Sequence, residues 1–304
     1  MDIIVGTRGS KLALTQTKWI ITQLKNKHPE LNFELKIITT TGDRIQNVSL
    51  DKIGEKGVFV KEIEEQLLEN KIDFAVHSMK DMPGELHPGL KFSWTPIRED
   101  CRDALILKDE YKSLDELPLG AKIATGSKRR GFQLLMVRPD LDIVPIRGNI
   151  DTRIRKMKEN NLDGIVLAAA GLKRLGLYKS LEKNIQLLSP KIMLPSPAQG
   201  ALALEVREDD ISIHNILESI TDYKTEIQIK CERAFLKGVN GNCHIPMGAL
   251  CTIEGNSIIL EGLLGNEEGT KIIKHEISGH IGEEEELGDK LAKIIVEEML
   301  GNDK

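Results

Sequence analysis

The sequence predicts an α/β protein with two similar halves and a smaller α+β domain at its carboxyl end. Apolar strand patterns alternate with helix patterns, as in a mostly parallel sheet, and after Pro96 the series begins again. The chain has 304 residues, which is too long for one ordinary hydrophobic core. We therefore expect two α/β halves with a cleft between them, followed by a separate small domain.

The first half should open with a strand over residues 2–5 and a turn over 6–10. A helix over 11–27 follows, for which Ser10 is a good N-cap. Next we expect a strand over 33–40, a long loop from Gly42, a helix over 60–70 and an apolar strand over 72–76.

In the second half, strands are predicted at 104–107, 122–125, 143–146 and 164–170, with a helix after Ser127. Residues 194–200 are predicted to cross into an apolar strand over 201–206. The remainder should form a helix from Tyr223, a glycine-rich loop, strands at 249–252, 257–263 and 271–277, and a final helix that begins with acidic residues.

Composition excludes several classes of protein. A net charge of -5 argues against a general nucleic-acid binder, and no apolar run approaches the length of a membrane span. The amino terminus lacks a secretion signal, and four cysteines without CxxC spacing favour reduced thiols, so we expect a cytoplasmic protein. No metal-ligand spacing is present, and no apolar stripe indicates an oligomer, so a monomer without metal is expected.

Positive charge is nevertheless concentrated in one region. Residues 121–160 hold ten Lys or Arg against four Asp or Glu. Arginines recur just after predicted strands, where ligands bind in open α/β sheets: Arg8, Arg129, Arg130, Arg147, Arg153 and Arg174. Any one of them taken singly reads as a solvated surface residue. Together they indicate a ligand with several carboxylates or phosphates, because guanidinium groups hold such anions bidentately.

Two further features could carry chemistry. Lys80 and Asp81 follow the apolar strand, either as a solvated local ion pair or as part of a site. Cys243 lies in a loop rich in glycine and asparagine, where a reactive thiol would be accessible. By contrast, residues 54–57 lack the spacing of a phosphate-binding loop, and Ser78 lacks the glycines of a nucleophile elbow.

Several motifs resemble those of the porphobilinogen deaminase family, also called hydroxymethylbilane synthases. The matching stretches run in the order of the family and cover all but about the last fifty residues: 7–14, 57–62, 76–81, 147–149, 170–176, 199–201, 232–235 and the Cys243 loop.

The resemblance implies three domains, of which the first two are similar to type-2 periplasmic binding proteins with a central cleft. The boundaries that we expect are 1–97 with 196–217, then 98–195, then 218–304. The resemblance also implies a dipyrromethane cofactor, made from the substrate porphobilinogen and joined to Cys243 by a thioether. The activity implied is the deaminating condensation of four porphobilinogen molecules onto this primer, followed by hydrolytic release of a linear tetrapyrrole for porphyrin and heme biosynthesis.

Residue roles follow from the same resemblance. Asp81 is the expected catalytic residue, which stabilises the azafulvenium cation formed when ammonia leaves and mediates proton transfer. The expected cofactor contacts, besides Cys243, are Lys80, Ser78, Thr125, Ser127, Arg129, Arg130, Arg147 and Gly171. The expected substrate contacts are Arg8, Ser10, Gln16, Lys52, Lys56, Arg147, Arg153, Arg174 and Gln199.

The chain departs from the family pattern at two places. Residues 124–130 read Ala-Thr-Gly-Ser-Lys-Arg-Arg where Gly-Thr-Ser-Ser-Leu-Arg-Arg is common, and Ala198 stands where glycine is frequent. Two other functions remain open from the residues: a non-catalytic receptor for carboxylate anions, and a Schiff-base enzyme that uses Lys80.

Overall fold

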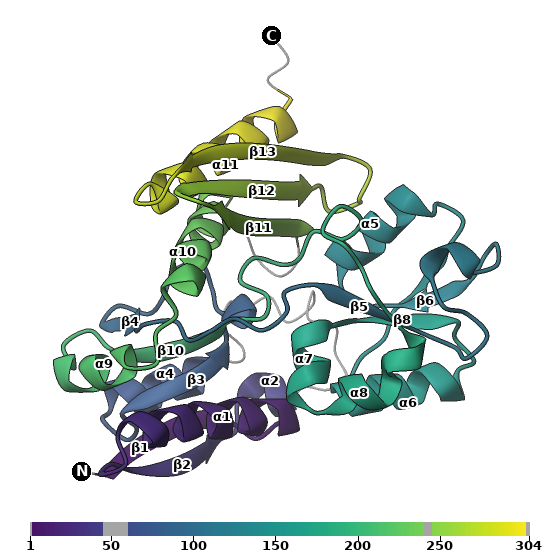
Figure 1. Cartoon of the computed structure of the whole chain (residues 1–304). Helices are drawn as coiled ribbons and strands as arrows, with labels where there is room; N and C mark the ends of the chain where they lie inside the picture. The colour runs from purple at the N-terminus through teal and green to yellow at the C-terminus, as the bar shows by residue number, and fades with distance from the viewer. Residues whose placement is uncertain (1, 45–59, 240–244, 302–304) are drawn as a thin grey trace. The chain divides into compact units, whose positions relative to one another are not determined.

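A computed structural model describes residues 2–44, 60–239 and 245–301 of the chain (Figure 1). The chain separates into two compact units. Unit 1 comprises Met1–Glu99 with Ala201–Ile227, and unit 2 comprises Asp100–Gly200 with Gln228–Lys304. We describe each unit by itself. Unit 2 contains both the second α/β half and the carboxyl-terminal domain, and the division into three domains stays a prediction.

Unit 1 is built on a five-stranded sheet with the order β2-β1-β3-β10-β4. β1 is parallel to β2 and β3, whereas β10 runs antiparallel to both β3 and β4. The strands are β1 (Asp2–Arg8), β2 (Asn32–Ile38), β3 (Phe74–Ser78), β4 (Leu90–Phe92) and β10 (Leu202–Arg207). The helices are α1 (Lys11–Lys27), α2 (Thr41–Arg44), α4 (Lys61–Leu68), the 3-10 turn η1 (Met79–Asp81) and α9 (Ile211–Glu218).

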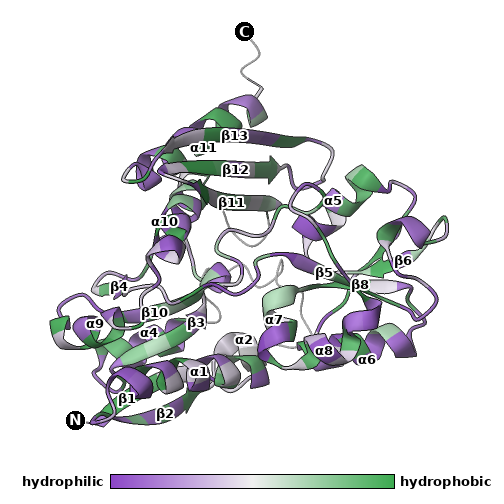
Figure 2. Cartoon of the chain, viewed as in Figure 1, coloured by the Kyte–Doolittle hydropathy of each residue, from purple (hydrophilic) through white to green (hydrophobic). Residues whose placement is uncertain are grey.

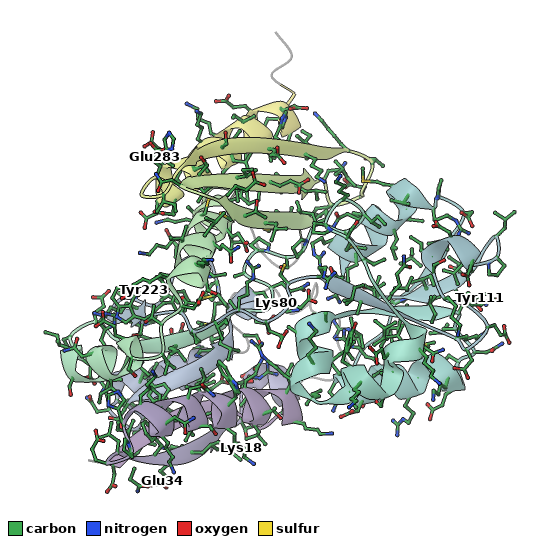
Figure 3. The ribbon with its side chains drawn as sticks, in the orientation of Figure 1. Lys18, Glu34, Lys80, Tyr111, Tyr223 and Glu283 are labelled. Carbon is green, nitrogen blue, oxygen red and sulfur yellow. The ribbon has the colours of Figure 1, made fainter. Side chains whose placement is uncertain are left out.

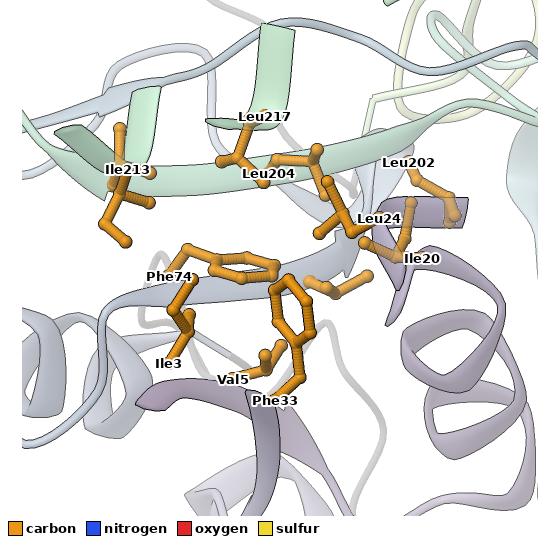
Figure 4. Packing of buried hydrophobic residues seen from close by; sticks show 12 residues of the cluster. Ile3, Val5, Ile20, Leu24, Phe33, Phe74, Leu202, Leu204, Ile213 and Leu217 are labelled. Carbon is orange, nitrogen blue, oxygen red and sulfur yellow. The ribbon is translucent and has the colours of Figure 1, made fainter. Parts of the chain in front are cut away.

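One hydrophobic core of unit 1 lies between this sheet and helices α1 and α9 (Figure 4), and a second one includes Ile63 and Leu67 of α4. Ile20 and Leu24 of α1 pack against Phe74 of β3, and all three are fully buried. Leu204 of β10 and Leu217 of α9 close the cluster from the other elements. The helix predicted over 11–27 is thereby confirmed, and the Ser10 hydroxyl caps it by accepting from the Ala13 amide at 3.2 Å.

Unit 2 contains a second five-stranded sheet with the order β7-β6-β8-β5-β9. Its strands are β5 (Asp103–Leu107), β6 (Lys122–Ala124), β7 (Asp142–Val144), β8 (Gly164–Ala168) and β9 (Ile185–Leu187). The helices of this region are η2 (Leu114–Glu116), α5 (Lys128–Val137), α6 (Ile150–Glu159), α7 (Ala169–Arg174), α8 (Leu177–Leu181) and η3 (Glu182–Asn184).

The two five-stranded sheets have the same topology. In each, three neighbouring strands are parallel (β2, β1 and β3; β7, β6 and β8), and the next strand (β10 or β5) runs antiparallel to its two neighbours. The antiparallel strand of unit 2 is the first that the chain makes there, and that of unit 1 is the last. The predicted repetition of the architecture in the second half is therefore confirmed, and so is the α/β class.

The carboxyl-terminal part of unit 2 is a three-stranded antiparallel sheet, β11-β12-β13. Its elements are α10 (Tyr223–Gly238), β11 (Met247–Glu254), β12 (Ser257–Gly265), β13 (Ile272–His280) and α11 (Glu284–Met299). α10 and α11 pack closely at Gly288, where an added Cβ would lie 2.6 Å from the Cys231 carbonyl oxygen. In Figure 2, α6 and α11 carry both hydrophilic and hydrophobic segments, as amphipathic helices do.

The structure corrects three local predictions. The apolar strand predicted over 72–76 is shifted by two residues, because β3 begins at Phe74 and ends at Ser78. The strand predicted over 164–170 ends at Ala168, where helix α7 follows directly. Residues 42–44, predicted as loop, belong to the short helix α2. Among the described residues, no helix combines the length and hydrophobicity needed to cross a membrane.

Candidate active site

In unit 1, Lys80 and Asp81 lie on a tight turn directly after a buried strand. Met79 and Met82, which flank the pair, are 1% and 3% exposed, and the Met79 amide donates to the Ala201 carbonyl at 3.1 Å. The two methionines anchor the turn in the protein, so Lys80 is half-buried and Asp81 is exposed. Figure 3 labels Lys80 at this turn.

The Asp81 carboxylate makes no hydrogen bond or ion pair with any residue that the structure describes. The turn therefore does not hold a local Lys80–Asp81 ion pair, which was the alternative interpretation of the sequence. An exposed carboxylate at the end of a sheet strand is available to a ligand.

The other predicted residues of unit 1 surround the carboxyl ends of β1 and β3, which are parallel neighbours. Arg8 is the last residue of β1 and is half-buried. On α1, Gln16 is 3% exposed, and its side-chain amide donates to the Ser78 hydroxyl at 3.0 Å. Ser10 is used as the helix cap. The structure thus brings Gln16 and Ser78 into direct contact.

A buried hydrogen-bonded pair, which the sequence analysis missed, lies just before this turn. His77 Nε2 is 3.0 Å from Glu205 Oε2, and the two side chains are 4% and 0% exposed. Burial, together with the nearby Glu205 carboxylate, raises the pKa of Glu64 on α4 above its ordinary value. Glu205 sits within the apolar run of β10, and no sequence pattern marked it as a partner of His77.

In unit 2, the predicted residues follow the carboxyl ends of three parallel neighbours, β6, β7 and β8. After β6, the Thr125 hydroxyl accepts from the Ser127 amide at 3.1 Å. Ser127 is the N-cap residue of α5, yet its hydroxyl bonds neither the helix nor any other described residue. At Gly126, an added Cβ would lie 2.8 Å from the Ile146 carbonyl oxygen, which explains the glycine in this departure from the family pattern.

Arg147 and Arg153 lie at the amino end of α6, after β7. Asn149 caps this helix by accepting from the Thr152 amide at 2.9 Å, and Arg153 Nε donates to the Gly148 carbonyl at 2.6 Å. Gly148 has a φ of 116°, a conformation that favours glycine. Two guanidinium groups and a helix amino terminus, all of positive character, therefore gather at one place.

Two more predicted residues follow β8. Gly171 is buried within α7. Arg174, at the end of the same helix, donates from Nη2 to the Gly200 carbonyl at 2.7 Å. The carboxyl ends of β6, β7 and β8 thus present arginines, a free hydroxyl and helix amino termini along one edge of the sheet. This donor set suits a ligand with several carboxylates.

Arg129 and Arg130 of α5 are each 6% exposed and share one buried carboxylate, Asp103. Arg129 Nη1 lies 2.8 Å from Asp103 Oδ2, and Arg130 Nη2 lies 2.7 Å from Asp103 Oδ1. Gln199, fully buried, donates to the same Oδ1 at 3.0 Å and to the Cys101 carbonyl at 2.7 Å. Burial would raise the pKa of Asp103, but the charges of both arginines outweigh burial and lower it.

Three predicted site residues, Lys52, Lys56 and Cys243, lie outside the described residues. Of the others, Arg129, Arg130 and Gln199 are brought together around Asp103, a residue that the sequence analysis did not single out. Its only signal was an acidic side chain at the start of the apolar run 104–107.

Comparisons with known proteins agree on one family. A model described as "Porphobilinogen deaminase, dipyromethane cofactor binding domain" matches residues 3–215, and one described as "Porphobilinogen deaminase, C-terminal domain" matches residues 227–297. The porphobilinogen deaminase of Clostridium novyi (strain NT) is 58% identical over 98% of this chain and 100% of its own length. That of Clostridioides difficile (strain 630) is 59% identical over 98% of each chain.

Solved structures that align with this chain have much lower sequence identity to it. A probable amino-acid ABC transporter extracellular-binding protein from Bacillus subtilis is 11% identical, with a TM-score of 0.44, over 72% of this chain and 90% of its own. The methionine binding protein MetQ is 16% identical, with a TM-score of 0.43, over 74% and 93%.

Proposed function

The chain belongs to the porphobilinogen deaminase family, and on that premise we propose how its residues carry out the reaction. It is a hydroxymethylbilane synthase, a transferase of tetrapyrrole biosynthesis, and its cofactor is dipyrromethane. The substrate, porphobilinogen, carries an acetate and a propionate on its pyrrole ring. A protein that lengthens a chain of such rings has to hold many carboxylates at once.

The donor set of unit 2 suits the cofactor. When bound, dipyrromethane supplies the nucleophilic α-carbon from which the product chain grows. We assign its attachment to Cys243. Its carboxylates would be held by Arg129, Arg147 and the Ser127 hydroxyl, with Thr125, Arg130, Gly171 and, from unit 1, Lys80 and Ser78 as supporting positions. This assignment is supported by the side chains that follow the carboxyl ends of neighbouring strands. The Ser127 hydroxyl, which bonds no described residue, and Arg129 follow β6, and Arg147 follows β7.

The incoming porphobilinogen also needs cationic partners. Arg8 at the end of β1, Arg153 on α6 and Arg174 on α7 would hold its carboxylates, together with Arg147. We also keep three polar residues as proposed substrate contacts: Ser10, Gln16 and Gln199. The side chain of each already makes a hydrogen bond within the protein. Lys52 and Lys56 complete the proposed set from outside the described residues.

Asp81 carries the chemistry in this proposal. Positive charge develops on the porphobilinogen ring as ammonia leaves, and a carboxylate beside the ring nitrogen lowers the energy of that cation. The same carboxylate can accept the proton that the condensing ring loses and return it at a later step. The single observation behind this role is that Asp81 is exposed on an anchored turn, with its carboxylate bound to no described residue.

No observation favours the alternative of a non-catalytic carboxylate receptor, or that of a Schiff-base enzyme using Lys80. We further propose that the enzyme acts as a monomer in the cytoplasm, without nucleic-acid or membrane partners. Light scattering on the eluting protein tests the monomer, and limited proteolysis tests the three-domain boundaries 1–97 with 196–217, 98–195 and 218–304.

The intact mass of the untreated protein, measured beside ammonia release from porphobilinogen, tests the function. We expect the active protein to exceed the mass of the bare chain by one dipyrromethane. Cys243→Ser should have the mass of the bare chain, whereas the control Cys101→Ser should keep the added mass. An active protein at the bare-chain mass would contradict the covalent cofactor. Binding of porphobilinogen without ammonia release would instead support the receptor.

A further inference from the structure

Asp103 is the one acidic residue that both Arg129 and Arg130 contact among the residues that the structure describes. It opens β5, which runs antiparallel to β8 with Asp103 opposite Ala168. The start of β5 therefore lies at the same edge of the sheet as the carboxyl ends of β6, β7 and β8, where the proposed cofactor contacts gather. Its side chain is fully buried.

The two arginines are bonded differently. Arg130 donates from Nε and Nη2 to Asp103 and from Nη1 to the Val166 carbonyl, so all three of its nitrogens have protein acceptors. Arg129 uses Nη1 alone, which donates to Asp103 at 2.8 Å and to the Leu194 carbonyl at 2.7 Å. Its Nε and Nη2 make no hydrogen bond with a described residue.

The acceptors of Arg129 Nη1 are themselves held in place. Gln199 donates to Asp103 Oδ1 at 3.0 Å. Gln133 accepts from the Leu194 amide at 2.7 Å and donates to the Leu194 carbonyl at 3.1 Å. Gln133 and Gln199 are 4% and 0% exposed. The guanidinium of Arg129 is thus fixed at one nitrogen by two rigid acceptors, and its other two nitrogens remain for a carboxylate.

We propose that Asp103 is a positioning residue, which presets the Arg129 guanidinium for one carboxylate of the cofactor while Arg130 anchors Asp103. This inference rests on the proposed function of Arg129 as a cofactor contact. Bidentate recognition of a carboxylate depends on the plane of the guanidinium, and displacement of a binding group by about 1 Å costs as much as 10²-fold in a well-ordered site. A buried anion that holds the plane before the ligand arrives removes the need to order it during binding.

The test measures cofactor loading rather than activity alone. Apo-protein of the wild type, Asp103→Asn and Arg129→Gln is incubated with increasing porphobilinogen, and intact mass gives the fraction of chains that carry dipyrromethane. We expect Asp103→Asn to need about tenfold more porphobilinogen, or more, for half-loading. Asp140→Asn is the matched control. It removes the bidentate partner of Arg138, just beyond the other end of α5, and should load like the wild type.

A double-mutant cycle separates positioning from general weakening of the fold. If Asp103 acts through Arg129, the effects of Asp103→Asn and Arg129→Gln on loading are not additive, because the second substitution removes what the first one disturbs. Additive effects would overturn the proposal. The proposal would also be overturned if Asp103→Asn takes up the cofactor like the wild type while Arg129→Gln takes up none. If Arg129→Gln itself loads normally, the assigned role of Arg129 in the proposed function is wrong instead.

Asp103→Asn leaves two buried cations without a counter-charge and could prevent folding. A second variant, which changes no charge, keeps the proposal testable in that case. Gln133→Leu changes no charge. It removes the two bonds that hold Leu194, the second acceptor of Arg129 Nη1, together with weaker bonds to the Arg129 carbonyl at 3.3 Å and to Met193 Sδ at 3.6 Å. It should raise the porphobilinogen needed for half-loading about two- to fivefold, by partial loss of the same orientation. Circular dichroism confirms folding of each variant before loading. Unchanged loading of folded Gln133→Leu, together with unchanged loading or absence of folded Asp103→Asn, would refute the proposal.

Discussion

Gln16 on α1 donates its side-chain amide to the hydroxyl of Ser78 at the end of β3, with 3.0 Å between nitrogen and oxygen. The bond ties the first helix of unit 1 to the residue that precedes the turn of Asp81. Gln16 is almost fully buried, so its amide has few other partners. Helix α1 thus holds the side chain of Ser78, and the backbone of the next residue, Met79, is bonded to the Ala201 carbonyl just before β10. The turn of Asp81 is supported by both contacts.

Ser78→Ala should lower the free energy of unfolding by about 1 to 3 kcal/mol, because it leaves the buried amide of Gln16 without its partner. The double variant Gln16→Leu/Ser78→Ala removes both polar groups and should recover part of that loss. Urea denaturation of the wild type, both single variants and the double variant gives the coupling. Strictly additive losses would show that the bond contributes nothing.

Asp81→Ala should fold with the thermal stability of the wild type and lose about 10²- to 10⁴-fold in turnover. Its carboxylate is exposed and bonds no described residue, so removing it breaks no contact of the described fold. Ammonia release at saturating porphobilinogen is the measurement, with Glu85→Gln, an exposed carboxylate further along the same loop, as control. Near-normal turnover by Asp81→Ala would exclude the proposed role.

Glu64 should make unit 1 less stable as the pH rises. Its pKa in the folded protein is raised by burial and by Glu205, while His87 and His77 act in the opposite direction. A carboxyl with a raised folded pKa contributes stability that is present below its unfolded value of 4.5 and is lost as the pH rises through the folded pKa.

Thermal melts from pH 4.5 upward test this sign. The wild type should lose stability over that range, and Glu64→Gln should lose less, because the amide does not ionise. Glu65→Gln, an exposed neighbour on α4, should follow the wild type. Identical pH profiles for Glu64→Gln and the wild type would contradict the prediction.

Ala198 is a left-handed residue in the crossing segment, with a φ of 59° and 1% exposure. Its amide donates to Glu232 Oε2 at 2.6 Å, which holds the segment on α10. A side chain in this conformation costs about 1 to 2 kcal/mol, and glycine avoids that cost at some loss of unfolded-state entropy. Ala198→Gly should therefore raise the free energy of unfolding by up to about 1 kcal/mol.

Ala198→Val is the control with the opposite expected effect on stability. The branched side chain should lower the free energy of unfolding by about 1 to 3 kcal/mol, since it fits neither the backbone conformation nor the buried space. Chemical denaturation of the three proteins gives the order Gly, Ala, Val. A valine variant as stable as the wild type would show that the strain is absent.

Much of unit 1 and unit 2 follows from local patterns in the sequence. The helix over 11–27 and its Ser10 cap could be predicted because period and capping are properties of neighbouring residues. The Lys80–Asp81 turn could be predicted because an apolar run ends just before it. The family, and with it the activity, could be recognised because its motifs are short stretches of chain.

Only the tertiary structure decided which of the polar and charged side chains bond one another. Asp103 bonds Arg129 and Arg130 across 26 and 27 positions, and His77 meets Glu205 across 128. Periodicity reports which face of an element is apolar, and it carries no information about which strand will lie beside it. The antiparallel insertion of β5 and β10 creates both contacts. The sequence by itself therefore determined most helices and strands, the turn of Asp81 and the reaction. The folded chain decided which charged side chains bond other residues of the protein and which are available to a ligand.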